Sequence, residues 1–322
     1  MRSYALAGNT GHYDAVIASL EERGLRVITA FASGLDARPA VERFFIEDGE
    51  PVVDAVLSLT GFSLVGGPAY NDSRAAEDML ARLDVPYLAA HALEFQSLEQ
   101  WEASDNGLMP IEATMMVAIP ELDGATGPAV FGGRSDTAEG RDQHDMRPHP
   151  ERITMLANRV ERLIALRRSE RAARKVALVI FNFPPHAGNT GTAANLAVFE
   201  SIFNTLRAMR GQGYSVDVPE DVDALRAAIV EGNAAQYGAM ANVQAHIPAD
   251  DHVAREPYLA EIEAQWGPAP GKELTDGRNL FVMGASFGNV FPGVQPALGY
   301  PADPLRPLSA RASPPTHPSP PP

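Results

Sequence analysis

One loop of the sequence carries four side chains that can contact a ligand. They lie in the stretch "VALVIFNFPPHAGNTGTA", directly after a buried apolar run, and are Asn182, His186, Asn189 and Thr190. Amide and hydroxyl groups can hold an anion, and a histidine can exchange protons near neutral pH. The two prolines before His186 fix two backbone angles and stiffen the loop. Ligand contact and a purely structural turn are the two interpretations of this loop.

Part of this loop is used twice in the chain. The residues AGNTG occur at 7–11 and again at 187–191. Glycines and small polar residues between a strand and a helix can present backbone N–H groups to a phosphate or carboxylate. Neither copy has the lysine of a phosphate-binding loop or the spacing G-x-G-x-x-G. For the N-terminal copy we therefore predict a structural turn in which Asn9 or Thr10 caps the following helix.

Acidic and histidine side chains gather in "QAHIPADDHVAREPY". They are His246, Asp250, Asp251 and His252. Their spacing matches no established metal signature, so we predict a helix cap before a helix that begins at about Val253, and no metal site.

A second acidic group lies in "IEATMMVAIPELDGATGP", at Glu112, Glu121 and Asp123. Paired carboxylates can act as acid and base, but these have no visible partner in the sequence. We predict a strand followed by a turn for this stretch.

The composition limits the functions that this chain can perform. Its 322 residues carry a formal charge of −15 and no cysteine. A strongly acidic chain repels nucleic acid and anionic membranes, and the lack of cysteine removes disulfides, thiolate metal sites and cysteine nucleophiles. No apolar run approaches the roughly 20 residues of a membrane span, and the first residues do not form a secretory signal. We expect a cytoplasmic protein that has no nucleic-acid partner and no membrane span.

The elements that must position these side chains alternate along the chain. Strand-like runs at 3–8, 25–32, 55–62 and 85–93 are separated by segments with helical apolar spacing. A long helix is expected from 150, followed by a strand at 175–183, a helix at 195–213, a strand at 214–218, a helix at 221–233 and a strand at 279–286. This alternation predicts an α/β fold made of two βαβ-type lobes with mainly parallel sheets.

Composition also suggests the domain boundaries. We expect an N-terminal lobe at 1–135, a linker at 136–149, a second lobe at 150–300, and a disordered tail at 301–322. The linker is rich in charged and small polar residues, and the tail is too rich in proline to form a packed element.

Four long stretches carry a resemblance to a known family. "SLTGFSLVGGPAYND", "LMPIEATMMVAIPELDGATGPAVFGGR", "FNFPPHAGNTGTAANLAVFESIFNTL" and "ADDHVAREPYLAEIEAQWGPAPG" resemble the large chelatase subunits. That family joins the porphyrin-binding subunit of magnesium chelatase with the large subunit of cobaltochelatase. The similarity runs almost continuously from Arg2 to Tyr300, and it is to the magnesium branch.

The resemblance implies a function in bacteriochlorophyll biosynthesis. Enzymes of the magnesium branch insert Mg²⁺ into protoporphyrin IX, and separate AAA+ type ATPase subunits hydrolyse the ATP. The reaction removes two pyrrole protons and strips water from a tightly hydrated ion, which explains the coupling to ATP. This sequence contains no nucleotide-binding loop, so ATP is expected on the partner subunits. A cobaltochelatase-like protein of cobalamin biosynthesis and a non-catalytic small-molecule-binding module stay open as alternatives.

Two departures from the family pattern stand out. Members of the family are far longer, and their later signature H-F-G-T-H-G, which precedes the catalytic glutamate, is not found here. We therefore expect this chain to be a fragment that lacks the catalytic residues of the family. After Tyr300, most apolar positions of the family are replaced by Pro, Ser or Ala.

Overall fold

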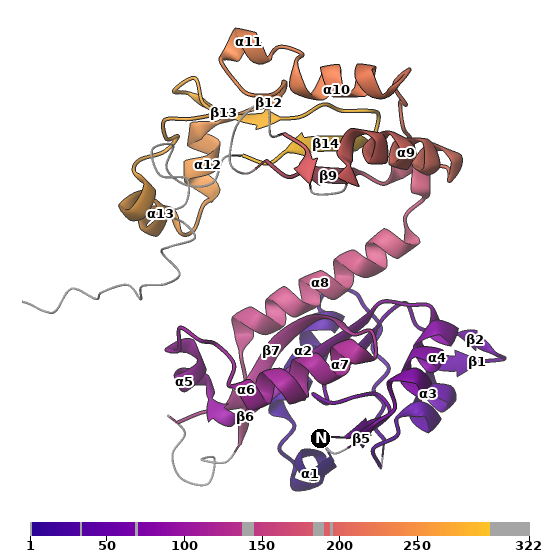
Figure 1. Ribbon diagram of the computed structural model, residues 1–322. Helices are drawn as coiled ribbons and strands as arrows, with labels where there is room; N and C mark the ends of the chain where they lie inside the picture. Colours follow the sequence, from indigo (N-terminus) through magenta and orange to yellow (C-terminus); the bar gives the residue numbers. More distant parts are fainter. Residues whose placement is uncertain are drawn as a thin grey trace, which may run out of the picture. The chain divides into compact units, whose positions relative to one another are not determined.

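A computed structural model describes residues 2–32, 34–67, 70–136, 145–182, 190–193 and 196–296. The protein has an α/β fold and divides into two compact units, Met1–Arg168 and Ser169–Pro322 (Figure 1). The predicted α/β fold is confirmed, and the four-stranded main sheet of unit 1 is mainly parallel, as expected. The tail expected to be disordered, 301–322, lies outside the described residues.

Unit 1 contains the longest strands of the described chain. Its elements are α1 (Arg2–Ala7), α2 (Gly11–Glu21), α3 (Arg38–Phe45), β1 (Ile46–Glu47), β2 (Glu50–Pro51), β3 (Val56–Ser58), β4 (Gly66–Gly67), β5 (Tyr70–Asn71), α4 (Ser73–Leu83), β6 (Tyr87–Ser97), α5 (Leu98–Glu102), α6 (Pro110–Glu112), the π-helix η1 (Ala113–Ala118), α7 (Ile119–Leu122), β7 (Thr126–Arg134), β8 (Met146–Pro148) and α8 (Pro150–Arg168). The main sheet has the order β3-β6-β7-β8. Strands β3, β6 and β7 are parallel, and β8 pairs antiparallel to β7.

Helices cover both faces of this sheet. Side chains along β6 alternate between the faces, as they must in a strand. Leu88 and Ala90 pack with α2 and α8 in one core cluster. Tyr87 and Ala89 pack with α3 and α4 in another. Unit 1 therefore has three layers, with the sheet in the middle.

The long helix α8 belongs to unit 1. We expected it to open the second lobe at residue 150, after a linker at 136–149. Its residues Ile153, Leu156 and Val160 are buried against the sheet of unit 1, and this apolar face explains the difference. Part of the expected linker, Met146–Pro148, is strand β8, whereas residues 137–144 lie outside the described residues.

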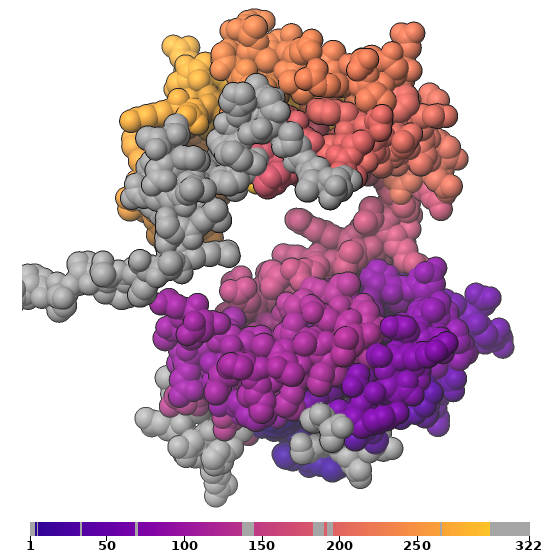
Figure 2. Space-filling model, in the orientation of Figure 1, coloured from indigo at the N-terminus to yellow at the C-terminus, as the bar shows by residue number. Residues whose placement is uncertain are grey.

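Several local predictions for unit 1 were wrong. The expected strand at 3–8 is helix α1, and residues 25–32 form no strand. The stretch that begins at Ile111, expected to be a strand followed by a turn, lies in a helical segment from Pro110 to Leu122 that includes the π-helix η1. Figure 2 shows this stretch in magenta on the surface of the unit. Short apolar runs do not distinguish strands from helices, and proline at the first helical position with Met, Ala and Glu after it favours a helix.

Unit 2 has shorter strands, most of them in two main pairs. Its elements are the 3-10 helix η3 (Arg171–Ala173), β9 (Val176–Ile180), β10 (Thr192–Ala193), β11 (Leu196–Ala197), α9 (Val198–Gly211), α10 (Val222–Val230), α11 (Ala234–Tyr237), β12 (Val243–Pro248), α12 (Ala249–Arg255), α13 (Leu259–Trp266), β13 (Asn279–Met283) and β14 (Val290–Val294). Strand β9 is parallel to β14, and β12 is antiparallel to β13. A bridge from Gly284 to Gly293 joins these two pairs.

The core of unit 2 lies between its strands and two helices. Leu206 of α9, Ile229 of α10 and Val290 of β14 are fully buried in one apolar cluster. The expected strand at 214–218 is an irregular segment that pairs with no described strand, although Val216 enters the same cluster. The helices expected at 195–213 and 221–233 are present as α9 and α10.

Two buried histidines lie in the core of unit 1. His12 at the start of α2 and His91 in β6 are 0% and 2% exposed. Neither ring has a hydrogen-bond partner among the described residues. His12 instead contacts three aromatic rings, and its ring stacks parallel to that of Phe131. Burial lowers the pKa of each histidine to about 4, because the charged ring would lose its hydration.

These histidines should make unit 1 sensitive to acid. The unfolded histidine takes up a proton near pH 6.5, whereas the folded one has its pKa lowered to about 4. Stability is therefore complete above about pH 6.5 and falls as the pH drops toward 4. We expect His91→Leu to flatten the pH dependence of the unfolding free energy in that window by about 1.4 kcal/mol per pH unit. Urea titrations at several pH values measure this slope, and an unchanged slope would contradict a neutral buried His91.

Candidate functional site

The C-terminal AGNTG copy follows β9, where the predicted ligand residues lie. Asn182 and Thr190 are 1% and 6% exposed. The hydroxyl of Thr190 donates to Oδ1 of Asn182 at 3.3 Å, and the backbone N–H of Gly191 donates to the carbonyl of Phe181 at 3.1 Å. The structure brings these two predicted residues together and closes the base of the loop. His186 and Asn189 lie outside the described residues.

The amide of Asn182 connects three segments of unit 2. Its Nδ2 lies 3.0 Å from the sulfur of Met240 and 3.4 Å from the carbonyl oxygen of Gln295, just beyond β14. The carboxyl ends of the parallel strands β9 and β14 therefore meet at this amide, which is the edge where α/β sheets bind ligands. The polar side-chain atoms of Asn182 and Thr190 are bonded to other atoms of the protein, so these two residues shape the carboxyl edge of β9 and β14.

Gly191 is needed where this loop ends. Its backbone has φ +75°, a conformation that side chains rarely adopt, and an added Cβ would lie 3.1 Å from the ring of Phe199. Helix α9 begins only at Val198, after the short pair β10–β11. The helix expected from residue 195 therefore begins three residues later.

The N-terminal AGNTG copy is a turn between two helices. Helix α2 begins at Gly11, and its cap residue Thr10 makes no side-chain capping bond. The hydroxyl of Thr10 donates to the carboxylate of Asp14 at 2.8 Å. Oδ1 of Asn9 accepts the N–H of Met146 at 3.0 Å and ties the turn to β8. The prediction that Asn9 or Thr10 caps the helix was wrong. The side chain of Asn9 bonds to β8 instead, and the side chain of Thr10 bonds to Asp14.

Glu112 has a structural role at the carboxyl end of β6 that was not predicted from the sequence. Glu112 is 0% exposed, and its carboxylate accepts bonds from Nε2 of Gln96 at 2.5 Å and the N–H of Met109 at 3.2 Å. It also accepts the N–H of Phe95 at 3.3 Å. The one signal in the sequence is Pro110 followed by Glu112, which is typical of the first turn of a helix. Glu112 is bound by backbone and amide donors, so it anchors this edge of the sheet.

The other two carboxylates of that stretch behave differently from each other. Asp123 is 1% exposed and accepts the N–H of Leu64 at 2.7 Å and the hydroxyl of Ser63 at 3.1 Å. Burial raises the pKa of Asp123 in spite of these bonds. Glu121 is exposed. No acid–base pair is formed by these residues.

A polar network lies where β6 and β7 end. The hydroxyl of Ser135 donates to Glu99 at 2.6 Å, and the N–H of Asp136 donates to the same carboxylate at 3.0 Å. These bonds, led by the one from Ser135, lower the pKa of Glu99 to about 2. The hydroxyl of Ser97 donates to Asp136 at 2.6 Å. This edge of unit 1 therefore carries fixed negative charge at neutral pH.

The residues considered for a metal are distributed over two elements. His246 lies on β12 and contacts the rings of Tyr237 and Phe281. Asp250 and Asp251 lie in the first turn of α12, which begins four residues before the expected start. Within the described parts of the chain, no three His, Cys, Asp or Glu side chains are grouped so that they could hold a metal ion.

Each unit thus presents polar side chains at the carboxyl edge of parallel strands, as α/β proteins that bind small molecules do. No helix in the described part of the chain has the length and apolar character to cross a bilayer. The CobN/Magnesium Chelatase family matches residues 1–318. The chain belongs to this family.

Named relatives include both branches of the family. The H subunit of magnesium chelatase from Cereibacter sphaeroides is 52% identical to this chain over 98% of its length, and that from Rhodobacter capsulatus is 51% identical. The CobN subunit of aerobic cobaltochelatase from Pseudomonas aeruginosa is 31% identical over 94% of this chain. The chain spans only 28%, 27% and 25% of these relatives, respectively.

A solved structure has the same fold. The catalytic subunit of cobaltochelatase from Mycobacterium tuberculosis superimposes with a TM-score of 0.73 at 27% sequence identity. The match covers 96% of this chain and 26% of that chain.

The contacts of Asn182 lead to a stability prediction. Asn182→Ala removes the partner of Thr190 and the amide beneath the carboxyl ends of β9 and β14. We expect the unfolding free energy to fall by about 1–3 kcal/mol, because buried polar groups lose their partners. Urea denaturation measures the change.

Asn204→Ala is the matched control, since Asn204 is an exposed asparagine of α9. It should change stability by no more than about 0.5 kcal/mol. Equal effects of the two substitutions would show that Asn182 does not anchor the edge.

Proposed function

We propose that this chain is part of the porphyrin-binding subunit of a magnesium chelatase. The observation that supports this most is the difference in identity between the branches: 52% to an H subunit of magnesium chelatase, but 31% to a CobN subunit of cobaltochelatase over a similar length. The alignment with the H subunit covers 98% of the chain, so it includes both units and the carboxyl edges of their parallel strands.

The proposed reaction is the ATP-dependent insertion of Mg²⁺ into protoporphyrin IX during (bacterio)chlorophyll biosynthesis. Protoporphyrin IX and Mg²⁺ are the substrates, and ATP is hydrolysed by two ATPase-related partner subunits. Cytoplasmic action is part of the proposal, on the basis of the cysteine-free composition. In this proposal the chain supplies binding surfaces to the reaction, which is supported by the polar side chains at the carboxyl edges of its parallel strands.

Cobalt insertion is the second candidate. The solved structure with the same fold is a cobaltochelatase subunit, so the fold alone does not separate the branches. A non-catalytic binding module is the third candidate. It differs from the other two because it predicts that this chain takes no part in metal insertion.

Ligand choice tests the branch. The 322-residue chain is titrated with protoporphyrin IX and, in parallel, with a metal-free corrinoid, and binding is followed by absorbance and by quenching of tryptophan fluorescence. We expect the porphyrin to bind and the corrinoid to bind at least about tenfold more weakly, a difference of about 1.4 kcal/mol. Preference for the corrinoid would overturn the magnesium assignment.

A chimera tests the link to catalysis. Residues 2–296 replace the matching segment of the H subunit from Cereibacter sphaeroides, and formation of magnesium protoporphyrin is measured with the ATPase subunits and ATP. Retained insertion supports the proposal. A folded, porphyrin-binding chimera without insertion would favour the non-catalytic binding module.

The loop after β9 gives a more local prediction. As part of the proposal, His186 and Asn189 contact the porphyrin from a loop whose base is closed by Asn182 and Thr190. His186→Ala combined with Asn189→Ala in the chimera should weaken porphyrin binding about tenfold or more, because two polar contacts of roughly 1 kcal/mol each are lost, while circular dichroism stays unchanged. Unchanged porphyrin affinity would reduce both AGNTG copies to structural turns.

A further inference from the structure

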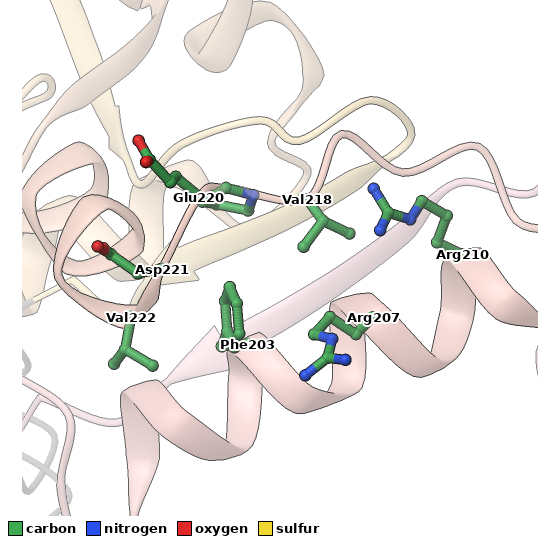
Figure 3. Close-up of a pocket in the computed structure, with 8 residues that line it drawn as sticks. Phe203, Arg207, Arg210, Val218, Glu220, Asp221 and Val222 are labelled. Atoms are coloured by element: carbon green, nitrogen blue, oxygen red, sulfur yellow. The ribbon is translucent and has the colours of Figure 1, made fainter.

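A pocket of about 380 Å³ lies between α9 and the segment that leads into α10. Figure 3 shows Phe203 at its centre, with Val218 and Val222 on the facing segment. Phe203 is half-buried, and these three side chains give the pocket an apolar floor. Its volume lies in the range of pockets that hold small molecules, roughly 300–1,000 Å³.

Two arginines line the pocket from successive turns of α9. Arg207 and Arg210 follow Phe203 at spacings of four and seven residues, so the three lie along one helix face. The guanidinium carbon of Arg207 lies 5.9 Å from the centroid of the Phe203 ring. Within the described parts of the chain, neither arginine forms an ion pair or a side-chain hydrogen bond.

The acidic residues nearby leave the two guanidinium groups unpaired. Asp221 uses its carboxylate to cap α10, accepting the N–H of Ala224 at 2.7 Å. In Figure 3 the carboxylates of Glu220 and Asp221 point away from Phe203 and from both arginines. Two like charges three residues apart on a helix also repel each other. An external anion would relieve this repulsion.

The pocket combines two binding properties. Its guanidinium groups match a carboxylate, to which arginine can donate two parallel hydrogen bonds. Its floor of Phe203, Val218 and Val222 matches an apolar ring or chain. A small inorganic anion would use only the first property, and a neutral apolar molecule only the second.

We propose that this pocket binds a carboxylate carried on an apolar ring or chain, with Arg207 and Arg210 holding the carboxylate and Phe203 contacting the apolar part. Two sources share this chemistry: the carboxylate side chains of a tetrapyrrole, which rests on the proposed function, and a smaller apolar carboxylate, which does not. The residues that line the pocket all belong to unit 2, and none of them is in the loop after β9.

The test compares charged and neutral forms of the same ligand. The full chain is titrated calorimetrically with 2-naphthoate and its methyl ester, and with protoporphyrin IX and its dimethyl ester. We expect the acid to bind at least about tenfold more tightly than the ester in at least one pair, because only the acid can pair with the guanidinium groups. The double variant R207Q/R210Q should lose that preference, and added salt should weaken binding of the acid.

Arg226→Gln is the matched control. Arg226 is an exposed arginine of α10 in the same unit and pairs with Glu231 at 3.5 Å. Its replacement should leave every affinity unchanged, and melting temperatures should show that all variants fold. Equal binding of acid and ester by the wild-type chain, no binding of either acid, or equal acid affinity in the wild type and R207Q/R210Q would overturn the pocket assignment.

The outcomes separate the pocket from the proposed function. Arginine-dependent binding of both acids supports the pocket as a tetrapyrrole subsite. Arginine-dependent binding of 2-naphthoate alone supports the pocket with a smaller carboxylate as its ligand. Porphyrin binding that ignores both arginines, with no binding of 2-naphthoate, overturns the pocket and leaves the chelatase proposal standing.

Discussion

The parallel pairing of strands is the constraint on which the rest of this structure depends. Parallel strands end at the same edge of a sheet, and the segments that leave this edge carry backbone N–H and C=O groups that need partners. In unit 1 the buried carboxylate of Glu112 accepts two such N–H groups, from Phe95 and Met109. In unit 2 the buried amide of Asn182 reaches the carbonyl of Gln295 beyond β14. Backbone groups near the strand ends are therefore bound by a carboxylate in unit 1 and by a side-chain amide in unit 2.

This constraint explains why polar residues of the expected type perform different tasks. Asn182 and Thr190 have the chemistry of ligand contacts, yet each satisfies the other at the base of a loop. Glu112 and Asp123 have the chemistry of a catalytic pair, yet each is bound to the backbone of its own surroundings. A buried polar group must find partners, and those partners often lie far away in sequence.

Much of the fold could be predicted from the sequence, and the exceptions have a common cause. Strands β6 and β9 and helices α2, α4 and α9 follow from apolar runs and helical spacing, because those patterns are local. The stretches at 3–8 and 110–122 have apolar runs of the same kind, but they become helices. A strand needs a neighbouring strand, and a short apolar run does not show whether such a long-range partner is present. The role of Asn9, which bonds to Met146, was hidden for the same reason.

The distribution of charge connects the fold to binding. A chain with a net charge of −15 repels a carboxylate ligand as a whole, so such a ligand must be held by local positive charge. The carboxyl edge of unit 1 adds to this repulsion, since the pKa of Glu99 is lowered to about 2. The guanidinium groups of Arg207 and Arg210 have the opposite sign and line a pocket beside an aromatic ring. Within the screening length of about 8 Å, two such groups act on a bound carboxylate far more strongly than distant acidic residues do. Local geometry therefore decides which anions this acidic protein can bind.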